Sequence, residues 1–267
     1  MEKYRLDQLL INKGLVSSRE KGKALIMAGQ VYVNGNKVEK SGTNVNNDAF
    51  VEIKGELLPY VSRGGLKLAK ALQEFDFALQ DKVMLDIGAS TGGFTDCALK
   101  NGAVKVYAVD VGYGQLAWSL RQDPRVVVME RKNARYLSSA DIVEAVDVIT
   151  IDVSFISLRK IIPQLGELLK EGGSLLALIK PQFEAGREYV GKKGVVKDQV
   201  VHEQIIREII TFSQDLGLTV QGLTYSPIKG PQGNIEFLLW LQKDGCVKRD
   251  LDKEKIKKIV AEAHLKL

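Results

Sequence analysis

Cysteine and histidine are scarce in this chain of 267 residues, which holds two of each. The cysteines, Cys97 and Cys246, are too few and too far apart for a disulfide framework or a zinc site. The histidines, His202 and His264, are too few for a metal centre built on imidazoles, and they argue against Ser-His-Asp chemistry. We therefore expect no bound metal.

Long apolar runs are missing as well. No stretch approaches the roughly 20 residues that cross a bilayer, and the first ten residues are charged throughout, unlike a signal peptide. We therefore expect a cytoplasmic protein. The hydrophobic fraction of 45% supports a sizeable core, and the length fits one large domain or two unequal ones. The net charge of +5 is compatible with a nucleic-acid partner without requiring one.

Three glycines stand close together in the sequence D-I-G-A-S-T-G-G-F-T at 86–95, directly after the apolar run 83–85. This order predicts a strand that ends at Asp86, a glycine-rich turn, and a helix that starts near Phe94. Without a Cβ, the backbone of the turn can pass close to a ligand. The glycines concerned are Gly88, Gly92 and Gly93.

Acidic residues beside this turn indicate its ligand. A second apolar run, 104–109, ends at Asp110, where a carboxylate can bind both hydroxyls of an adenosine ribose. A dinucleotide site has G-x-G-x-x-G and a helix N-terminus aimed at a pyrophosphate, whereas here Asp86 precedes G-x-S-x-G-G and would repel phosphate. Because a carboxylate suits an amino group and a sulfonium, we interpret the turn as a site for S-adenosylmethionine (SAM). The alternative is a tight strand–helix turn of an α/β domain without a ligand.

The first 55 residues form a unit of their own. Leucines at helical spacing predict a first helix, and Ser17 or Ser18 is a candidate N-cap for a second helix over about 18–28. The sequence V-Y-V-N-G-N-K-V predicts a β-hairpin that turns at Asn34-Gly35.

This unit resembles the S4 RNA-binding domain in the blocks R-L-D-Q-L-L, S-S-R-E-K-G-K-A-L-I-M-A-G and V-Y-V-N-G. In that family two short helices and a hairpin present basic side chains to structured RNA, where phosphate contacts hold position. The resemblance implies such contacts for Arg5, Ser18, Arg19 and Lys23. Residues 1–40 hold eight basic and four acidic side chains, and this positive excess is compatible with RNA binding. A solvated helix face, or a small cap without a ligand, is the plainer explanation.

After a linker at 56–62, strands and helices alternate, which predicts a doubly wound α/β sheet over 63–245. Strands are expected near 83–86, 104–109, 126–129, 146–151, 174–179, 219–226 and 235–241, and helices near 64–74, 93–101, 114–121, 157–170 and 199–216. Only a short loop separates the last two strands, so the final strand should run antiparallel, as in Rossmann-like methyltransferases. The tail 246–267 is basic and helical in pattern, with no role assigned.

Four charged side chains stand among apolar neighbours. Asp152 and Lys180 end predicted strands, and thus lie at the carboxyl edge of the sheet, where ligands bind. Glu236 lies early in the last strand, and Lys67 lies on the helix before the first. Taken singly, each has a plain explanation as a loop cap, a surface lysine, an edge ion pair or part of a solvated helix face.

Together these features are similar to the TlyA family of ribosomal RNA 2′-O-methyltransferases, in which an S4 domain precedes an FtsJ/RrmJ-like methyltransferase domain. Some members are named haemolysins. The similarity covers essentially the whole chain, through S-R-G-G-L-K-L, D-I-G-A-S-T-G-G-F-T, V-D-V-G, D-V-S-F-I-S, I-K-P-Q-F-E, G-K-K-G-V-V-K-D and G-N-I-E-F. It implies methyl transfer from SAM to a cytidine ribose of rRNA in ribosomal subunits. The catalytic set that it implies is Lys67, Asp152, Lys180 and Glu236.

For the cofactor, the resemblance and the local chemistry agree. The resemblance implies that Asp110 binds the ribose, that Asn133 contacts the adenine, and that Asp152 lies close to both cofactor and substrate. Around the methionine part it implies Asp86, Gly88, Ser90, Thr91, Gly92, Gly93 and Phe94. A metal is not needed, because the methyl donor is activated by its own positive charge.

A ribose 2′-hydroxyl is a poor nucleophile while it is protonated, and a positioned base typically accelerates such a step by 10²–10⁴-fold. Lys180 is the candidate base. Burial and the neighbouring Lys67 favour a neutral Lys180 amine, whereas Asp152 and Glu236 favour the ammonium ion. Accepting the proton and orienting the hydroxyl therefore both stay open as roles.

Other activities would require other sequence features. Transfer to a base nitrogen usually shows Asn/Asp-Pro-Pro-Tyr after the fourth strand, where this chain has D-V-S-F. Transfer to C5 of a pyrimidine needs a nucleophilic cysteine at that edge, and neither Cys97 nor Cys246 fits. A non-catalytic ribosome-assembly factor would keep the S4 unit and lose a member of the catalytic set. A pore-forming haemolysin would need a membrane-spanning or strongly amphipathic exposed segment, and the sequence has neither.

Overall fold

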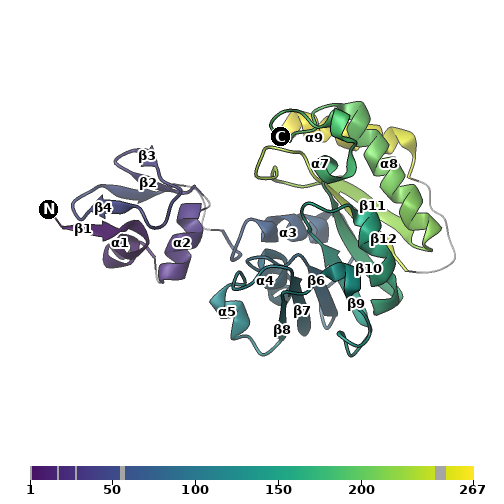
Figure 1. The fold of residues 1–267 in the computed structure, drawn as a ribbon, viewed down its shortest axis with the longest axis horizontal. Helices are drawn as coiled ribbons and strands as arrows, with labels where there is room; N and C mark the ends of the chain where they lie inside the picture. The colour runs from purple at the N-terminus through teal and green to yellow at the C-terminus, as the bar shows by residue number, and fades with distance from the viewer. Residues whose placement is uncertain (1, 17, 28, 55–57, 244–250) are drawn as a thin grey trace. The chain divides into compact units, whose positions relative to one another are not determined.

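The computed structural model describes residues 2–16, 18–27, 29–54, 58–243 and 251–267. The chain divides into two compact units, Met1–Arg63 and Gly64–Leu267 (Figure 1). Some expectations fall outside the described residues in whole or in part: the Ser17 cap, Cys246, the linker 56–62 and the start of the tail 246–267.

Within its described residues, the first unit has two short helices and two small antiparallel sheets (Figure 1). The elements are β1 (Lys3–Arg5), α1 (Leu6–Asn12), α2 (Arg19–Met27), β2 (Val31–Val33), β3 (Asn36–Lys37), β4 (Asn44–Asn46) and β5 (Val51–Ile53). The sheets have the orders β3-β2-β5 and β1-β4. Leu6, Leu9 and Leu10 are fully buried and form the core of this unit with valines of the strands.

The hairpin turn and the helix cap expected in this unit are both present. Asn34 and Gly35 have φ values of 49° and 80°, as a two-residue turn of type I′ between β2 and β3 requires. Ser18 Oγ accepts a hydrogen bond from the Lys21 amide at 3.2 Å, which caps the start of α2.

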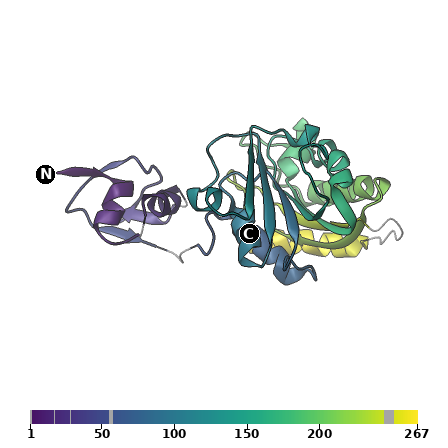
Figure 2. The ribbon, with the colours of Figure 1, turned by 90° about the horizontal axis from the view of Figure 1, so that it is seen from below.

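The second unit is built on a seven-stranded sheet with helices on both sides (Figures 1 and 2). Its strands are β6 (Val83–Ile87), β7 (Lys105–Asp110), β8 (Val126–Glu130), β9 (Val146–Ile151), β10 (Leu169–Ile179), β11 (Thr219–Tyr225) and β12 (Phe237–Gln242). Their order in the sheet is β11-β12-β10-β9-β6-β7-β8. β12 pairs antiparallel with β10 and β11, and the other pairs are parallel. The predicted sheet with an antiparallel last strand is confirmed.

Alternate residues along the strands face two layers of helices. The helices are α3 (Gly64–Glu74), α4 (Gly93–Lys100), α5 (Trp118–Arg121), α6 (Ile162–Leu165), α7 (Pro181–Glu184), α8 (Gln199–Asp215) and α9 (Lys253–Lys266). Leu85 and Ile149 belong to the large core that includes the buried face of α8. Asp86 and Thr150 point to the opposite face, where Thr95 of α4 contacts Asp86.

Two expected helices are much shorter than predicted. Region 157–170 holds two 3₁₀ turns around the four-residue α6, and region 114–121 holds only α5. Pro163 at the start of α6 has no amide hydrogen to donate, and β10 already begins at Leu169. Gly114 has a φ of +70°, which a right-handed helix does not allow. Both predicted helices were therefore wrong in their extent.

The helical pattern of the tail is confirmed as α9. Ile256, Val260 and Ala263 on one face of α9 join the main core, and α9 packs against β11 and α8. The tail thus belongs to the second unit. Among the described helices, none combines the length and the apolar character that a bilayer crossing requires.

Candidate active site

The four charged side chains that the sequence singled out meet at the carboxyl edge of the sheet. Lys180 Nζ lies 2.5 Å from Asp152 Oδ1, and Lys67 Nζ lies 3.1 Å from Asp152 Oδ2. Lys67 Nζ also lies 2.9 Å from Glu236 Oε2, an ion pair without hydrogen-bond geometry at that oxygen. We name Lys67, Asp152, Lys180 and Glu236 the tetrad.

The strand order explains why these distant residues meet. β10 lies between β9 and β12, and Asp152 and Lys180 directly follow β9 and β10, which are parallel. Because β12 runs the opposite way, its first residues lie at the same edge, and Glu236 immediately precedes β12. Lys67 reaches this edge from α3.

The tetrad is buried, and its charges act on one another. Lys67, Lys180 and Glu236 are only 8%, 7% and 1% exposed. Burial disfavours the Asp152 carboxylate, but the ammonium groups of Lys67 and Lys180 outweigh burial and hold the pKa of Asp152 below its usual value. Burial also disfavours the Lys67 ammonium, but Asp152 and Glu236 outweigh it and raise the pKa of Lys67. Asp152 and Lys67 are therefore both ionised at neutral pH.

The segment after Asp152 contributes two residues that the sequence reasoning missed. Ser154 Oγ accepts a hydrogen bond from Lys180 Nζ at 3.1 Å, so Lys180 has two fixed partners. Phe155 has a φ of +66° and is 88% exposed, and its ring packs on Phe183 with a centroid distance of 5.2 Å. A bulky residue in this conformation costs about 1–3 kcal/mol. The motif D-V-S-F marked the segment, but neither the strain nor the exposure can be read from sequence.

The glycine-rich turn touches the tetrad at Gly88. Gly88 has a φ of +84°, and a Cβ there would lie 2.5 Å from the carbonyl oxygen of Asp152. At Gly92, with a φ of +94°, a Cβ would overlap the side chain of Leu120. Close packing against the Asp152 backbone therefore requires glycine at Gly88, and the left-handed backbone conformation favours glycine at both positions.

Asp110, the last residue of the neighbouring strand β7, binds the backbone of this turn. Its Oδ2 accepts a hydrogen bond from the Ser90 amide at 2.8 Å, and its Oδ1 accepts one from the Gly112 amide at 2.7 Å. Each oxygen of a carboxylate has a second lone pair, so both can also accept a ribose hydroxyl. Ser90 is held at a φ of +48°, which is uncommon for a residue with a side chain.

Asp86 lies beneath the turn and is fully buried. Its Oδ2 accepts a hydrogen bond from the Thr95 hydroxyl at 2.7 Å, and its Oδ1 accepts one from the Thr150 hydroxyl at 3.0 Å. Burial raises the pKa of Asp86 to about 6, although these hydroxyls oppose the shift. Asp86 therefore ties β6 to α4 and β9, and its contact with the methionine part of a ligand stays a prediction.

The remaining expected cofactor residues lie along the same edge. Thr91 belongs to the turn, and Gly93 and Phe94 open α4. Asn133 is exposed and caps the 3₁₀ turn Ala134–Tyr136 after β8. This donor set, with carboxylates beside a glycine turn, fits a ligand that carries an amino group, a sulfonium and a ribose. In the part of the chain that the structure describes, no three His, Cys, Asp or Glu side chains are grouped as metal ligands.

In the first unit, two of the expected RNA-contacting residues converge on Asp7. Arg5 donates from Nε and Nη2 to Asp7 at 3.1 and 3.0 Å, and Arg19 Nε donates to Asp7 Oδ2 at 3.1 Å. Asp7 is fully buried, whereas both arginine side chains are about half exposed. The hydrogen bond from Arg5 lowers the pKa of Asp7. Asp7 thus holds two guanidinium groups at the surface, a role that its place in R-L-D-Q does not reveal. Lys23 is exposed on α2.

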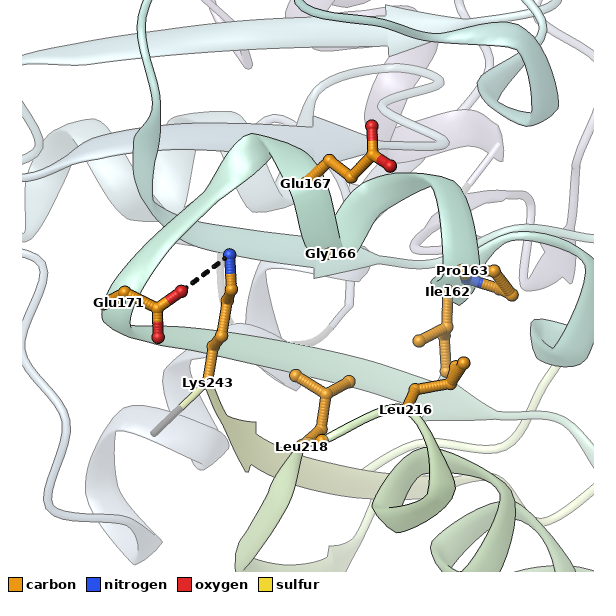
Figure 3. A pocket seen from close by; sticks show the side chains of 9 residues that line it. Ile162, Pro163, Gly166, Glu167, Glu171, Leu216, Leu218 and Lys243 are labelled. Atoms are coloured by element: carbon orange, nitrogen blue, oxygen red, sulfur yellow. Dashed lines mark ion pairs between the residues drawn. The ribbon is translucent and has the colours of Figure 1, made fainter. Parts of the chain in front are cut away.

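A pocket lies at the opposite end of the strands from the tetrad (Figure 3). It encloses about 360 Å³, with Ile162, Leu216 and Leu218 as apolar lining, and Lys243 pairs there with Glu171 at 3.0 Å. The pocket borders the start of β10, whereas Lys180 follows its end, so the two sites are about 30 Å apart by strand length. The pocket is therefore separate from the cofactor turn.

Comparisons with known proteins identify the family of each unit. Residues 60–243 match the family model described as FtsJ-like methyltransferase, and residues 5–51 match the S4 domain. The chain is 56% identical to "Putative rRNA methyltransferase YqxC" of Bacillus subtilis, over 98% of this chain and 95% of that protein. It is 44% identical to "16S/23S rRNA (cytidine-2'-O)-methyltransferase TlyA" of Mycobacterium tuberculosis, over 89% of each.

A solved structure also resembles this chain. "Putative hemolysin from Streptococcus thermophilus" is 48% identical and has a TM-score of 0.80, with 100% of this chain and 97% of that chain covered. Both family models, the full-length relatives and this structure point to one assignment. The chain belongs to the TlyA family of FtsJ-like methyltransferases, which carry an S4 domain ahead of the methyltransferase domain.

Proposed function

We propose that this protein transfers a methyl group from SAM to the 2′-hydroxyl of a cytidine in ribosomal RNA. The observation that carries the proposal is the buried tetrad, in which Lys180 Nζ lies 2.5 Å from Asp152 beside a turn suited to SAM. The M. tuberculosis relative, named for cytidine 2′-O-methylation of 16S and 23S rRNA, supports the substrate class. In this proposal residues 1–55 bind RNA and residues 63–245 carry out catalysis.

The residues proposed to hold the cofactor form one continuous edge. SAM supplies a methyl group that the positive charge on its sulfur has already activated. Asp110 would bind the ribose hydroxyls through the lone pairs left over from Ser90 and Gly112, and Asn133 would contact the adenine. The methionine part would lie against Asp86, Gly88, Ser90, Thr91, Gly92, Gly93 and Phe94.

Lys180 acts on the proton of the 2′-hydroxyl in this proposal. Its Nζ has fixed partners in Asp152 Oδ1 and Ser154 Oγ, which leaves one tetrahedral position for the substrate. Paired with Asp152, Lys180 starts as an ammonium ion and first releases one proton to solvent. The resulting neutral amine presents a lone pair there and takes the hydroxyl proton as the oxygen gains the methyl group. The proton then leaves Nζ for solvent. General-base action of this kind contributes about 10²–10⁴-fold.

The other members of the tetrad position Lys180. Asp152 fixes the direction of Lys180 Nζ, and Lys67 holds Asp152 and Glu236 through its two ion pairs. In the first unit, Arg5, Ser18, Arg19 and Lys23 would bind phosphates of structured rRNA. The exposed edges of the two guanidinium groups held by Asp7 support this assignment.

The test compares Lys180→Ala with Lys258→Ala, an exposed lysine of α9, in transfer of labelled methyl from SAM to undermodified 30S and 50S subunits. We expect Lys180→Ala to lose at least about 10²-fold in kcat, with SAM affinity by calorimetry unchanged and Lys258→Ala like wild type. Full activity of Lys180→Ala would overturn the role of Lys180. A wild-type protein that does not bind SAM would overturn the proposed reaction and favour a non-catalytic assembly factor.

A further inference from the structure

The segment G-K-K-G-V-V-K-D, residues 191–198, carries three lysines with exposed side chains: Lys192, Lys193 and Lys197. None of the three has an ion-pair partner among the residues that the structure describes. The acid of this segment, Asp198, is engaged elsewhere, because it accepts a hydrogen bond from the Val200 amide at 2.8 Å and caps α8. We call residues 191–198 the lysine loop; its three lysines and Asp198 give it a formal charge of +2.

The lysine loop is linked to two members of the tetrad, to Lys180 along the chain and to Glu236 through Asn234. On one side the chain runs from Lys180 through α7, which is labelled in Figure 1, and a 3₁₀ turn at Arg187–Tyr189 into the loop. On the other side it is bound by Asn234, two residues before Glu236. Asn234 Oδ1 accepts a hydrogen bond from the Val196 amide at 3.0 Å, and Nδ2 donates to the Gly194 carbonyl at 2.8 Å.

The turn that carries Asn234 also packs against Glu236. A Cβ at Gly230 would lie 2.6 Å from Glu236 Oε1, and the Gly230 amide donates to the Asn234 carbonyl at 2.9 Å. Asn234 is fully buried, and both the oxygen and the nitrogen of its side-chain amide bind the loop. The lysine loop is therefore anchored next to the reacting edge and not at a remote surface.

The backbone of the loop is held at several points. The Gly191 amide donates to the Val195 carbonyl at 3.1 Å, and Val196 is buried. His202 Nε2 lies 3.1 Å from the Val196 carbonyl oxygen. Burial lowers the pKa of His202 to about 4, so the ring is neutral at physiological pH and its Nε2–H can donate to that oxygen. A fixed backbone that carries exposed lysine tips suits an anion that binds in one place.

The tetrad itself offers RNA no net attraction. It holds two lysines and two carboxylates, so its formal charge is zero. Contacts with phosphates dominate the affinity of proteins for nucleic acids, and they have to come from groups around the reacting centre. We propose that the lysine loop binds phosphates of the RNA strand that flanks the target nucleotide, an inference that rests on the RNA substrate proposed above. Lysines act there as point charges that position the strand without reading its bases.

The test compares two triple variants that each remove three positive charges. One is Lys192→Gln/Lys193→Gln/Lys197→Gln in the lysine loop, and the control is Lys253→Gln/Lys255→Gln/Lys258→Gln on the exposed side of α9. Binding to undermodified subunits is measured from 50 to 200 mM salt, with SAM affinity and thermal unfolding as checks on each folded variant. Wild-type methyl transfer is measured in parallel and tests the proposed reaction by itself.

We expect the loop variant to lower the slope of log Kobs against log salt by about 2, since each phosphate contact contributes roughly 0.7 for single strands. Wild type should then lose roughly 20-fold more affinity than the loop variant across this salt range. The control should keep the wild-type slope, and both variants should bind SAM as wild type does. A loop variant with the slope of the control would overturn the inference, even if wild-type transfer is robust.

Discussion

Replacing Lys67 by methionine tests the tetrad as a structural unit. Methionine keeps an aliphatic stem but removes the ammonium that lies 3.1 Å from Asp152 Oδ2 and 2.9 Å from Glu236 Oε2. Removing one partner of a buried ion pair costs about 3–5 kcal/mol, because the remaining charge stays buried without compensation. We therefore expect Lys67→Met to lower the free energy of unfolding by about this amount at pH 7. Lys258→Met, at an exposed site, should change it by less than about 0.5 kcal/mol.

The size of this loss should depend on pH in a direction that the tetrad sets. The raised pKa of Lys67 stabilises the fold below its ordinary value of 10.5, and that stability is lost as pH rises through the folded pKa. The lowered pKa of Asp152 stabilises the fold above 3.8, and that stability is lost as pH falls through the folded pKa. The difference between wild type and variant should therefore be steady over roughly pH 5–9 and shrink in acid.

Urea unfolding followed by tryptophan fluorescence measures this difference. Both tryptophans, Trp118 and Trp240, lie in the second unit, so the signal reports the unit that holds the tetrad. A Lys67→Met protein with the wild-type midpoint at pH 7 would refute the buried ion-pair network on which the proposed chemistry depends.

Three further changes have defined outcomes. Gly88→Ala should cost about 1–3 kcal/mol in unfolding free energy and most of the methyl transfer, because its Cβ would lie 2.5 Å from the Asp152 carbonyl oxygen. Gly114→Ala, with a φ of +70° but open space around it, is the matched control and should keep transfer. Phe155→Gly should leave thermal stability unchanged or higher, since it relieves left-handed strain at an 88% exposed side chain; a lower unfolding midpoint would contradict this. Asp86→Asn should gain stability relative to wild type as pH rises from about 4 to 6, by up to about 3 kcal/mol. Over this range the unfolded wild type ionises Asp86, whereas the folded protein, in which the pKa is about 6, keeps the proton. Parallel pH profiles of unfolding for the two proteins would contradict that burial.

Local patterns predicted the framework of the fold well. Apolar runs located the strands of the large sheet, and the short loop before β12 implied its antiparallel direction. The turn at Asn34-Gly35 followed from backbone chemistry alone. The helix expected over 157–170 was wrong in extent, because β10 already begins at Leu169 and Pro163 interrupts the helical hydrogen bonds. Hydrophobic periodicity alone does not distinguish a short buried helix from a strand.

The candidate site was predictable only as a set of positions. Placing Asp152 and Lys180 at strand ends implied a shared edge, because parallel neighbours end together, but the ion pairs depend on side-chain packing. Asp7, Ser154 and Asn234 lie within the quoted motifs, but their roles could not be read there, since each binds a partner that the fold brings from elsewhere in the chain. The lysine loop was visible as a motif, and its anchor beside Glu236 was not.

The nucleoside formed on undermodified ribosomal subunits tests the central claim most directly. Subunits incubated with wild-type protein and labelled SAM would be digested to nucleosides, and the labelled product would be identified by mass spectrometry, with Lys180→Ala in parallel. The account predicts 2′-O-methylcytidine from wild type and almost none from the variant. A label on a base, or equal 2′-O-methylation by the variant, would contradict it.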